Sequence, residues 1–436
     1  MEQGKRLVYL GIGLMLLVLS LTAPARADEI SELKKLLNEQ AKVLQQLQER
    51  ITQLEARQRL KERSLTEKIQ EVAEQKQAPA PTLPDSIKWI EKIKWSGDFR
   101  YRHDTIDDDS GSTTRDRNRI RARLKMEAEV NDEWDAVFRL ASGSSDSPTS
   151  TNQTLGDSDA DSFSSKEIWL DQAYADYHPG SMPGLNIMAG KMSNPFYLVG
   201  KNQIIFDTDV SPEGGAATYQ WNMDDSTSAQ LTGGAYWLSE RSTNADTSIF
   251  GIQGLLKHKL SHDSHILGGV SYYDFGNIKG KTLAGVSSEG NTTTPVAGTS
   301  GIFANDYNVL EGFGEYGFMI GEVPAAVFGS YVNNMAASNS EDSAWIIGTK
   351  YNKAKEPGSW EVSYNYRDVE KDAVVGGLSD SDFIGGGTDG KGHVFGFNYQ
   401  LAKNVQAGVL YYVAEKNAST SEDDYKLLQG NLVFKF

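Results

Sequence analysis

From about residue 94 to residue 436, apolar and polar residues alternate with a period of two, which is the period of a β-strand. The clearest stretch begins at Arg115, where the odd-numbered positions carry charged side chains as far as Glu129. The even-numbered positions from Ile120 to Val130 are apolar. On a helix these charges would spread around the whole circumference, whereas on a strand they gather on one face. The pattern predicts a strand with one charged and one apolar face.

The same alternation predicts about sixteen strands along this part of the chain. We expect them at residues 93–103, 115–130, 134–142, 166–178, 185–191, 215–222, 228–238, 247–259, 265–275, 306–318, 325–333, 342–351, 359–369, 392–401, 405–414 and 425–436. Long connections rich in Asp, Ser, Gly and Thr alternate with short turns, the long ones being 104–114, 143–165, 192–214, 239–246, 276–305, 334–341, 370–391 and 415–424. Long loops at one end and tight turns at the other are typical of an antiparallel β-barrel that crosses an outer membrane. The sequence therefore predicts an all-β fold with a transmembrane barrel over residues 94–436.

A seven-residue period precedes the barrel. Between residues 28 and 77 there is no Gly or Pro, and apolar residues recur along one seam at Ile30, Leu33, Leu37, Leu44, Leu47, Ile51, Leu54, Leu65 and Val72. This repeat predicts an α-helical coiled coil, and it implies self-association because a long helix with such a seam is not stable alone. A helix folded back on its own barrel is the alternative. Three prolines within residues 78–93 predict a stiff linker between the two regions.

The first residues show a third pattern. Lys5 and Arg6 precede an apolar run from Leu7 to Leu21, and small residues follow at positions 25 and 27. This arrangement predicts a secretory signal peptide over residues 1–27. An uncleaved membrane anchor is the alternative, although the run is short for a membrane span. In either case we expect the chain to leave the cytoplasm.

Charge and composition remove several classes of function. The chain has 43 Lys and Arg against 59 Asp and Glu, and this net charge of −16 argues against nucleic acid as a partner. It has no Cys, which excludes disulfides, iron–sulfur clusters and thiolate metal sites. A mean hydropathy of −0.46 excludes a helical membrane bundle. His258, His262 and His265 straddle a predicted turn, and no catalytic or phosphate-binding motif is present. We therefore expect no metal, no cofactor and no enzymatic activity.

Several short motifs occur in an order that points to a family. They are Trp95–Arg102, Arg115–Leu124, Asp171–Asp176 and Gly190–Phe196, followed by an amphipathic last strand that ends at Phe436. With the coiled coil, they resemble bacterial outer-membrane porins, and in particular the porins that carry an N-terminal coiled coil in the periplasm. The resemblance implies a homotrimer in contact with outer-membrane lipid and lipopolysaccharide. It also implies that the barrel-assembly machinery recognises the strand ending at Phe436.

The candidate site is a constriction of the pore. A barrel of about sixteen strands leaves a water-filled lumen, because its side chains cannot fill the interior. The first two strands would project a basic row into it, made of Arg100, Arg102, Arg117, Arg119, Arg121, Arg123 and Lys125. The resemblance implies that the loop after the fifth strand, Met192 to Gly214, folds inward, and that its charged residues face the row: Lys201, Asp207, Asp209 and Glu213. Alternatively, the row pairs with acids of the wall itself, namely Glu127, Glu129, Asp135 and Asp171.

Taken together, these features predict an outer-membrane porin for passive diffusion of small hydrophilic solutes and ions, with its coiled coil in the periplasm. One alternative is a structural anchor that tethers the envelope through the coiled coil. Another is an enzyme or a sheath for a redox partner; because the chain has no Cys, any haem would have to be carried by another protein. The ion preference stays open, because acidic loop stretches at Asp107–Asp109 and Asp157–Asp161 oppose the basic row.

Overall fold

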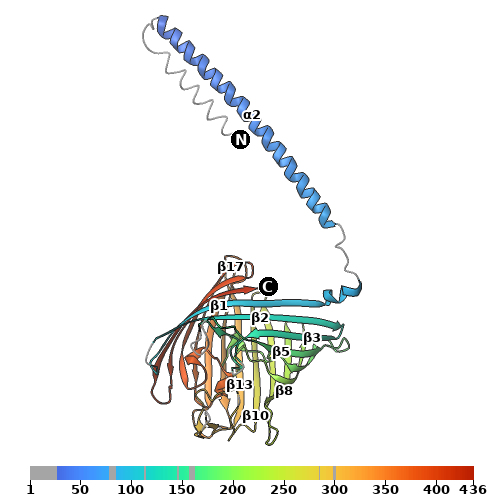
Figure 1. The fold of residues 1–436 in the computed structure, drawn as a ribbon, viewed down its shortest axis with the longest axis vertical. Coiled ribbons are helices and arrows are strands. Elements are labelled where there is room, and N and C mark those ends of the chain that lie inside the picture. The colour runs from blue at the N-terminus through green and yellow to red at the C-terminus, as the bar shows by residue number, and fades with distance from the viewer. Residues whose placement is uncertain are drawn as a thin grey trace. The chain divides into compact units, whose positions relative to one another are not determined.

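Figure 1 shows the computed structural model of the chain, which describes residues 27–77, 85–111, 114–144, 147–156, 163–283, 285–297 and 301–436. The chain divides into two compact units, Met1–Ile87 and Lys88–Phe436. Residues 1–26 of the predicted signal peptide lie outside the described residues, and so do residues 78–84 of the predicted linker.

The first unit consists, as far as it is described, of one long helix, α2 (Ala27–Gln77), and the first residues of a short 3-10 helix. The predicted helix is thus present, and at 1.5 Å per residue its 51 residues extend about 75 Å. Along its seam Leu37, Leu44, Leu47, Ile51, Leu54 and Leu65 are all exposed. None of the described helices carries an apolar stretch of the length needed to cross a bilayer. The association of this helix with other copies stays a prediction.

The second unit is a β-barrel. A short 3-10 helix, η1 (Asp85–Lys92), leads into the first strand. Sixteen long strands then follow: β1 (Ile93–Asp108), β2 (Arg115–Asn131), β3 (Trp134–Ser142), β5 (Ile168–Tyr177), β6 (Leu185–Lys191), β7 (Glu213–Asn222), β8 (Thr227–Ser239), β9 (Thr247–Ser261), β10 (Ser264–Gly276), β13 (Tyr307–Ile320), β14 (Val323–Asn334), β15 (Ser343–Asn352), β16 (Trp360–Val369), β17 (Gly390–Ala402), β18 (Val405–Lys416) and β19 (Asp423–Lys435). Two-residue strands also occur: β4 (Gln153–Thr154) pairs with β2, while β11 (Thr293–Thr294) and β12 (Ile302–Phe303) pair with each other.

Every strand of the wall pairs antiparallel with its neighbours, and the sheet closes on itself. The strand β1 pairs with β2 on one side and with β19 on the other, so the start and the end of the wall lie side by side (Figure 1). The predicted fold, a transmembrane-type antiparallel barrel of about sixteen strands after a helix, is confirmed. Of the predicted ends, that of the first strand is the most displaced, because β1 continues to Asp108 where it still pairs with Tyr425.

The two faces of the wall differ as the alternation predicts. Large apolar side chains on one face are exposed, among them Phe99, Leu124, Phe138, Leu170, Leu231, Ile252, Val270, Ile347, Phe395 and Val409. An exposed apolar band on alternate strand positions is what a barrel presents to lipid. The other face carries the charged and polar positions together with buried apolar residues such as Ile249, Tyr273 and Val309, which pack against the loops inside.

The core of this unit lies inside the barrel, where loops from one end of the sheet fold back among the strands. We call three of them inner loops: residues 192–212 between β6 and β7, residues 277–306 between β10 and β13, and residues 370–389 between β16 and β17. Their buried apolar residues join one continuous cluster with inward-facing strand residues. From the loops it contains Met192, Phe196, Val199, Ile204, Ile205, Phe206, Val210, Ile278, Leu283, Val286, Phe303, Ala373, Val374, Val375 and Leu378.

Candidate channel constriction

Inner loop 192–212 is held against the wall by a hydrogen-bonded glutamine and a tightly packed glycine. Gln253 of β9 accepts the backbone N–H of Tyr197 at 2.7 Å and donates to the carbonyl of the same residue at 3.0 Å. Gly200 has a φ of 60° and lies so close to the ring of Phe328 that a β-carbon would overlap it. Only glycine adopts this conformation without strain, so the chain can approach the wall closely here. The loop therefore packs on the inner face of the wall, where it contacts β9 through Gln253 and β14 through Phe328.

The basic row sits on β1 and β2, whose register brings like charges together. Arg100 lies opposite Arg121 in the ladder, and Arg102 lies opposite Arg119. Like charges directly opposite each other on a sheet are destabilising. Carboxylates must therefore lie nearby, and they come from two sources.

The first source is β1 itself. The carboxylate of Asp98 accepts a hydrogen bond from Arg121 at 2.7 Å and another from Arg123 at 2.8 Å. Asp104 lies 2.8 Å from the Nε atom of Arg117. Both acids are buried, so these are charge-assisted hydrogen bonds largely withdrawn from water. These hydrogen bonds hold the arginines of β2 against the neighbouring strand β1.

The second source is the inner loops. Asp209 of loop 192–212 lies 3.2 Å from Arg123 and 3.9 Å from Arg121. Asp382 of loop 370–389 lies 2.8 Å from Arg102. These two loop carboxylates meet the strand positions at which arginines face each other. The inner loops therefore offset the repulsion that the register of the wall creates.

Asp207 has a different environment from that of Asp209. Its carboxyl oxygens accept the backbone N–H of Asp209 at 2.8 Å and that of Ser381 at 3.0 Å, and its own N–H donates to the carbonyl of Leu378. Burial, together with the neighbouring charges of Asp380 and Asp209, raises the pKa of Asp207 to about 8. Asp207 therefore joins two inner loops instead of facing the basic row.

The other predicted residues of the site lie apart from the arginines. Lys125 binds Glu127 on the same strand at 3.0 Å. Lys201 is exposed on the inner loop. Glu213 begins β7 and binds Lys191 at 2.7 Å. Of the three loop acids expected to face the row, the structure brings Asp209 alone into contact with it.

Of the four wall acids considered as alternatives, Glu127 alone binds a member of the row, Lys125. Glu129 binds Lys92 and Asp171 binds Arg139, while Asp135 lies 3.3 Å from the Nε2 atom of His178. Sequence reasoning missed Asp98, Asp104 and Asp382. The first two could have been found, because they share the strand face of Arg100 and Arg102. Asp382 lies in an irregular loop and gives no periodic signal.

The other two inner loops were not predicted to fold inward. In loop 370–389, Asp380 lies 2.6 Å from Arg367 of β16. In loop 277–306, the side-chain amide of Asn291 donates to the carbonyls of Lys371 and Val374, each at 2.7 Å. The inner loops therefore bind one another as well as the wall.

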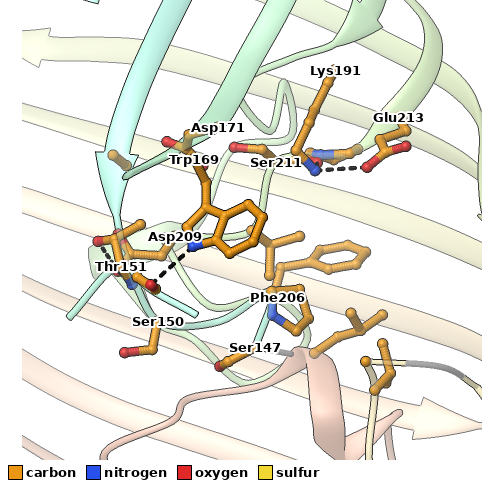
Figure 2. A pocket seen from close by; sticks show the side chains of 18 of the residues that line it. Ser147, Ser150, Thr151, Trp169, Asp171, Lys191, Phe206, Asp209, Ser211 and Glu213 are labelled. Carbon is orange, nitrogen blue, oxygen red and sulfur yellow. Dashed lines mark hydrogen bonds and ion pairs between the residues drawn. The ribbon is translucent and has the colours of Figure 1, made fainter. Parts of the chain in front are cut away.

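A cavity of about 390 Å³ lies between loop 192–212, residues 147–151 and the loop ends of β3, β5, β6 and β8. Figure 2 shows Trp169 in its middle, with the Lys191–Glu213 ion pair on one side. On the other side Asp209 accepts hydrogen bonds from the backbone and the hydroxyl of Thr151. The charges that line this cavity are thus largely paired. In the described part of the chain, no three acidic or histidine side chains are grouped to hold a metal ion.

Comparison with known proteins identifies one family and several solved structures with a similar fold. The model of a family described as "Putative porin" matches residues 107–310 and 314–429. No curated protein matches the chain. Among solved structures, OprB of Pseudomonas putida is 11% identical, with a TM-score of 0.52 over 80% of this chain and 96% of its own. OmpF of Salmonella typhi is 12% identical, with a TM-score of 0.48 over 79% of this chain and 97% of its own. At such identities the likeness to OprB concerns the fold alone.

Proposed function

The chain belongs to the "Putative porin" family of bacterial outer-membrane barrels, and from this premise we propose that it is a channel for passive diffusion of small hydrophilic solutes and ions. One observation carries the proposal: inside a closed sixteen-strand barrel, an acid of an inner loop binds arginines of the wall. A barrel of this size encloses water, and passage depends on its width and on the fixed charges at its narrowest point. The proposed activity is transport and not catalysis.

We propose that the constriction consists of the basic row and loop 192–212. The contact between Asp209 and Arg123 supports this, because it fixes the loop at the level of the row. An arginine stays charged at every physiological pH, so the lining keeps its charge. In this constriction the electric field is strongest between the arginines and the acids that contact them, such as Asp209. Lys201 and Glu213 lie away from the arginines and contribute less to the field at the narrowest point of the pore.

Single-channel recording of the purified protein in planar bilayers tests this function. We expect stepwise conductance, and under a salt gradient we expect the triple variant Arg119→Ala/Arg121→Ala/Arg123→Ala to shift the reversal potential toward cations. Arg241→Ala is the matched control, because Arg241 is a loop-end guanidinium bound to neutral oxygens. Absence of conductance steps in the wild type would overturn the channel. Steps without a shift would leave the channel and reduce the arginines to scaffolding of the wall.

The exposed seam of α2 supports a second proposal, that the helix forms a periplasmic coiled coil which holds a homotrimer together. In this arrangement residues 1–27 are a cleaved signal peptide and residues 78–93 a linker. The exposed apolar wall contacts lipid and lipopolysaccharide, and the strand ending at Phe436 is recognised by the assembly machinery. The same seam also suits a tether to another envelope component. Deletion of residues 28–77 separates the two: a channel still conducts, whereas loss of a tether weakens the attachment of the outer membrane.

A further inference from the structure

A second cavity opens at the loop end of the barrel, beside the first strands. It has a volume of about 540 Å³ and lies between β1, β2, residues 147–150 and the inner loops 277–306 and 370–389. Three arginines of β2 line it in succession: Arg115, Arg117 and Arg119. Alternate residues of a strand are separated by about 7 Å, so the three form a ladder that runs inward from the rim.

The charges of this cavity do not balance. Its lining includes four cations, which are the three arginines and Lys416, against two acids, Asp108 and Glu289. Lys416 is paired with Asp108 at 3.2 Å, and Arg117 is paired with Asp104 behind the lining. The guanidinium groups of Arg115 and Arg119 are left over against one acid of the lining, Glu289, so the cavity keeps an excess of positive charge.

Arg119 lacks a close carboxylate among the described residues. The nearest is Asp104 at 4.0 Å, and that acid is already bound to Arg117 at 2.8 Å. One terminal nitrogen of Arg119 donates to the hydroxyl oxygen of Ser150 at 3.2 Å, and its buried Nε atom has no partner within the described chain. A buried cation bound only to a neutral oxygen is costly, so this position favours an anionic partner.

The hydroxyl group of Ser150 points to the same kind of partner. Its oxygen accepts hydrogen bonds from Arg119 and from the backbone and side chain of Asn152. Its own proton has no acceptor among the described residues, and it remains available to donate. Ser150 lines both cavities, and Figure 2 shows it at the edge of the first. A guanidinium with an unused N–H beside an unused O–H is a donor set suited to an oxyanion.

We propose that this cavity binds the oxyanion group of a permeating solute, a phosphate or a carboxylate, with Arg119 and Ser150 as its ligands and Arg115 at the rim. The proposal rests on the channel function and names the class of solute that the channel favours. A guanidinium matches the geometry of both oxyanions and binds them through paired hydrogen bonds. The exposed Arg115 attracts the anion at the mouth, and the solute then moves along the ladder to Arg119.

Block of single-channel current by added anions tests the site. Inorganic phosphate is added to one series of bilayers and succinate to another, in potassium chloride at constant ionic strength. We expect either anion to reduce the wild-type current in a concentration-dependent way. Arg119→Gln should raise the half-blocking concentration at least about tenfold, since a hydrogen bond to a charged group is lost. Arg119→Lys keeps the positive charge but lacks the paired N–H donors of a guanidinium group, so its half-blocking concentration should lie between those of the wild type and Arg119→Gln. The control Arg241→Gln should be blocked at the same concentration as the wild type.

The outcomes separate this proposal from the channel itself. Block by phosphate alone assigns the site to phosphorylated solutes, and block by succinate alone assigns it to carboxylates. Stepwise conductance that neither anion reduces overturns the site and leaves the channel. Equal block of Arg119→Gln and the wild type overturns the site as well. If the wild type gives no steps, the channel function fails, and the solute class fails with it.

Discussion

Asp207 joins two inner loops through a carboxyl group that is protonated at neutral pH. It is 4% exposed, and burial together with the charges of Asp380 and Asp209 raises its pKa to about 8. Its hydrogen bonds to the N–H groups of Asp209 and Ser381 span the junction between loops 192–212 and 370–389. We predict that ionisation of Asp207 loosens this junction, and that the conductance of the channel rises above pH 8.

The direction of this pH dependence follows from the pKa of Asp207 in the open and in the packed junction. In an open junction Asp207 would titrate near 3.8, whereas in the packed junction it titrates near 8. Between these values the packed state holds the proton, so its stability is complete below about pH 4 and falls as the pH rises through 8. The difference corresponds to roughly 6 kcal/mol, at about 1.4 kcal/mol per pH unit. Local opening of a loop costs less free energy than global unfolding. The strands of the barrel therefore stay paired while the junction between the two loops opens.

The assay is single-channel recording from pH 5 to pH 9 at constant ionic strength. Over the upper part of this range the ionised fraction of Asp207 rises from about 1% at pH 6 to about 90% at pH 9. We expect larger and noisier currents above pH 8 in the wild type. The variant Asp207→Asn, which cannot ionise, should give currents that do not change with pH. Asp263→Asn, on an exposed turn at the other end of the barrel, should keep the wild-type response. A flat wild-type profile, or an unchanged response in Asp207→Asn, would refute the reasoning.

Three further predictions concern the wall, the inner loop and the helix. Asp98→Asn removes the buried carboxylate that two partly buried guanidinium groups share, and it should lower the free energy of unfolding by about 3 kcal/mol, measured by urea titration in detergent; an unchanged midpoint would contradict it. Gly200→Ala forces a β-carbon into the ring of Phe328 and should cost about 1–3 kcal/mol and alter the conductance, whereas Gly254→Ala, with open space around it, should do neither. Ile51→Asp places a charge in the exposed seam of α2 and should abolish cross-linking of full-length chains into oligomers; persistence of the oligomer would mean that the barrel alone holds it together.

The strands of the wall were predictable because a barrel imposes one rule on every residue. Successive side chains face lipid and interior in turn, so the period of two persists from β1 to β19. The α2 helix was predictable for the same reason, since it contains no Gly or Pro and its apolar residues keep a single period. In both cases the order of apolar and polar residues along the chain directly reflects which side of the strand or helix is apolar.

The interior was less predictable, because its contacts follow no period. The inward position of loop 192–212 was expected from the family resemblance, and apolar residues such as Ile204 and Phe206 agree with it. Loop 277–306 is instead rich in Gly and Thr, and loop 370–389 in Gly and Asp, as solvated loops are. The salt bridge between Arg102 and Asp382 joins residues 280 positions apart, and only the three-dimensional arrangement brings them together. Composition could therefore suggest that acids face the basic row, but it could not say which ones.

The interlocked inner loops also set an order for folding. The hydrogen bonds of Ser381 to Asp207 and to Thr149 close chain segments of 174 and 232 residues, whereas each hairpin of the wall pairs strands that are close in sequence. Contacts between close neighbours form first, and contacts that close long segments form late because their entropic cost is greater. The hairpins of the wall therefore form before the inner loops have found one another, but the pairing of β1 with β19 closes a longer segment still and is also late. Closure of the barrel and packing of the inner loops thus belong to the same late stage of folding, and the bore of the pore takes its final width only there.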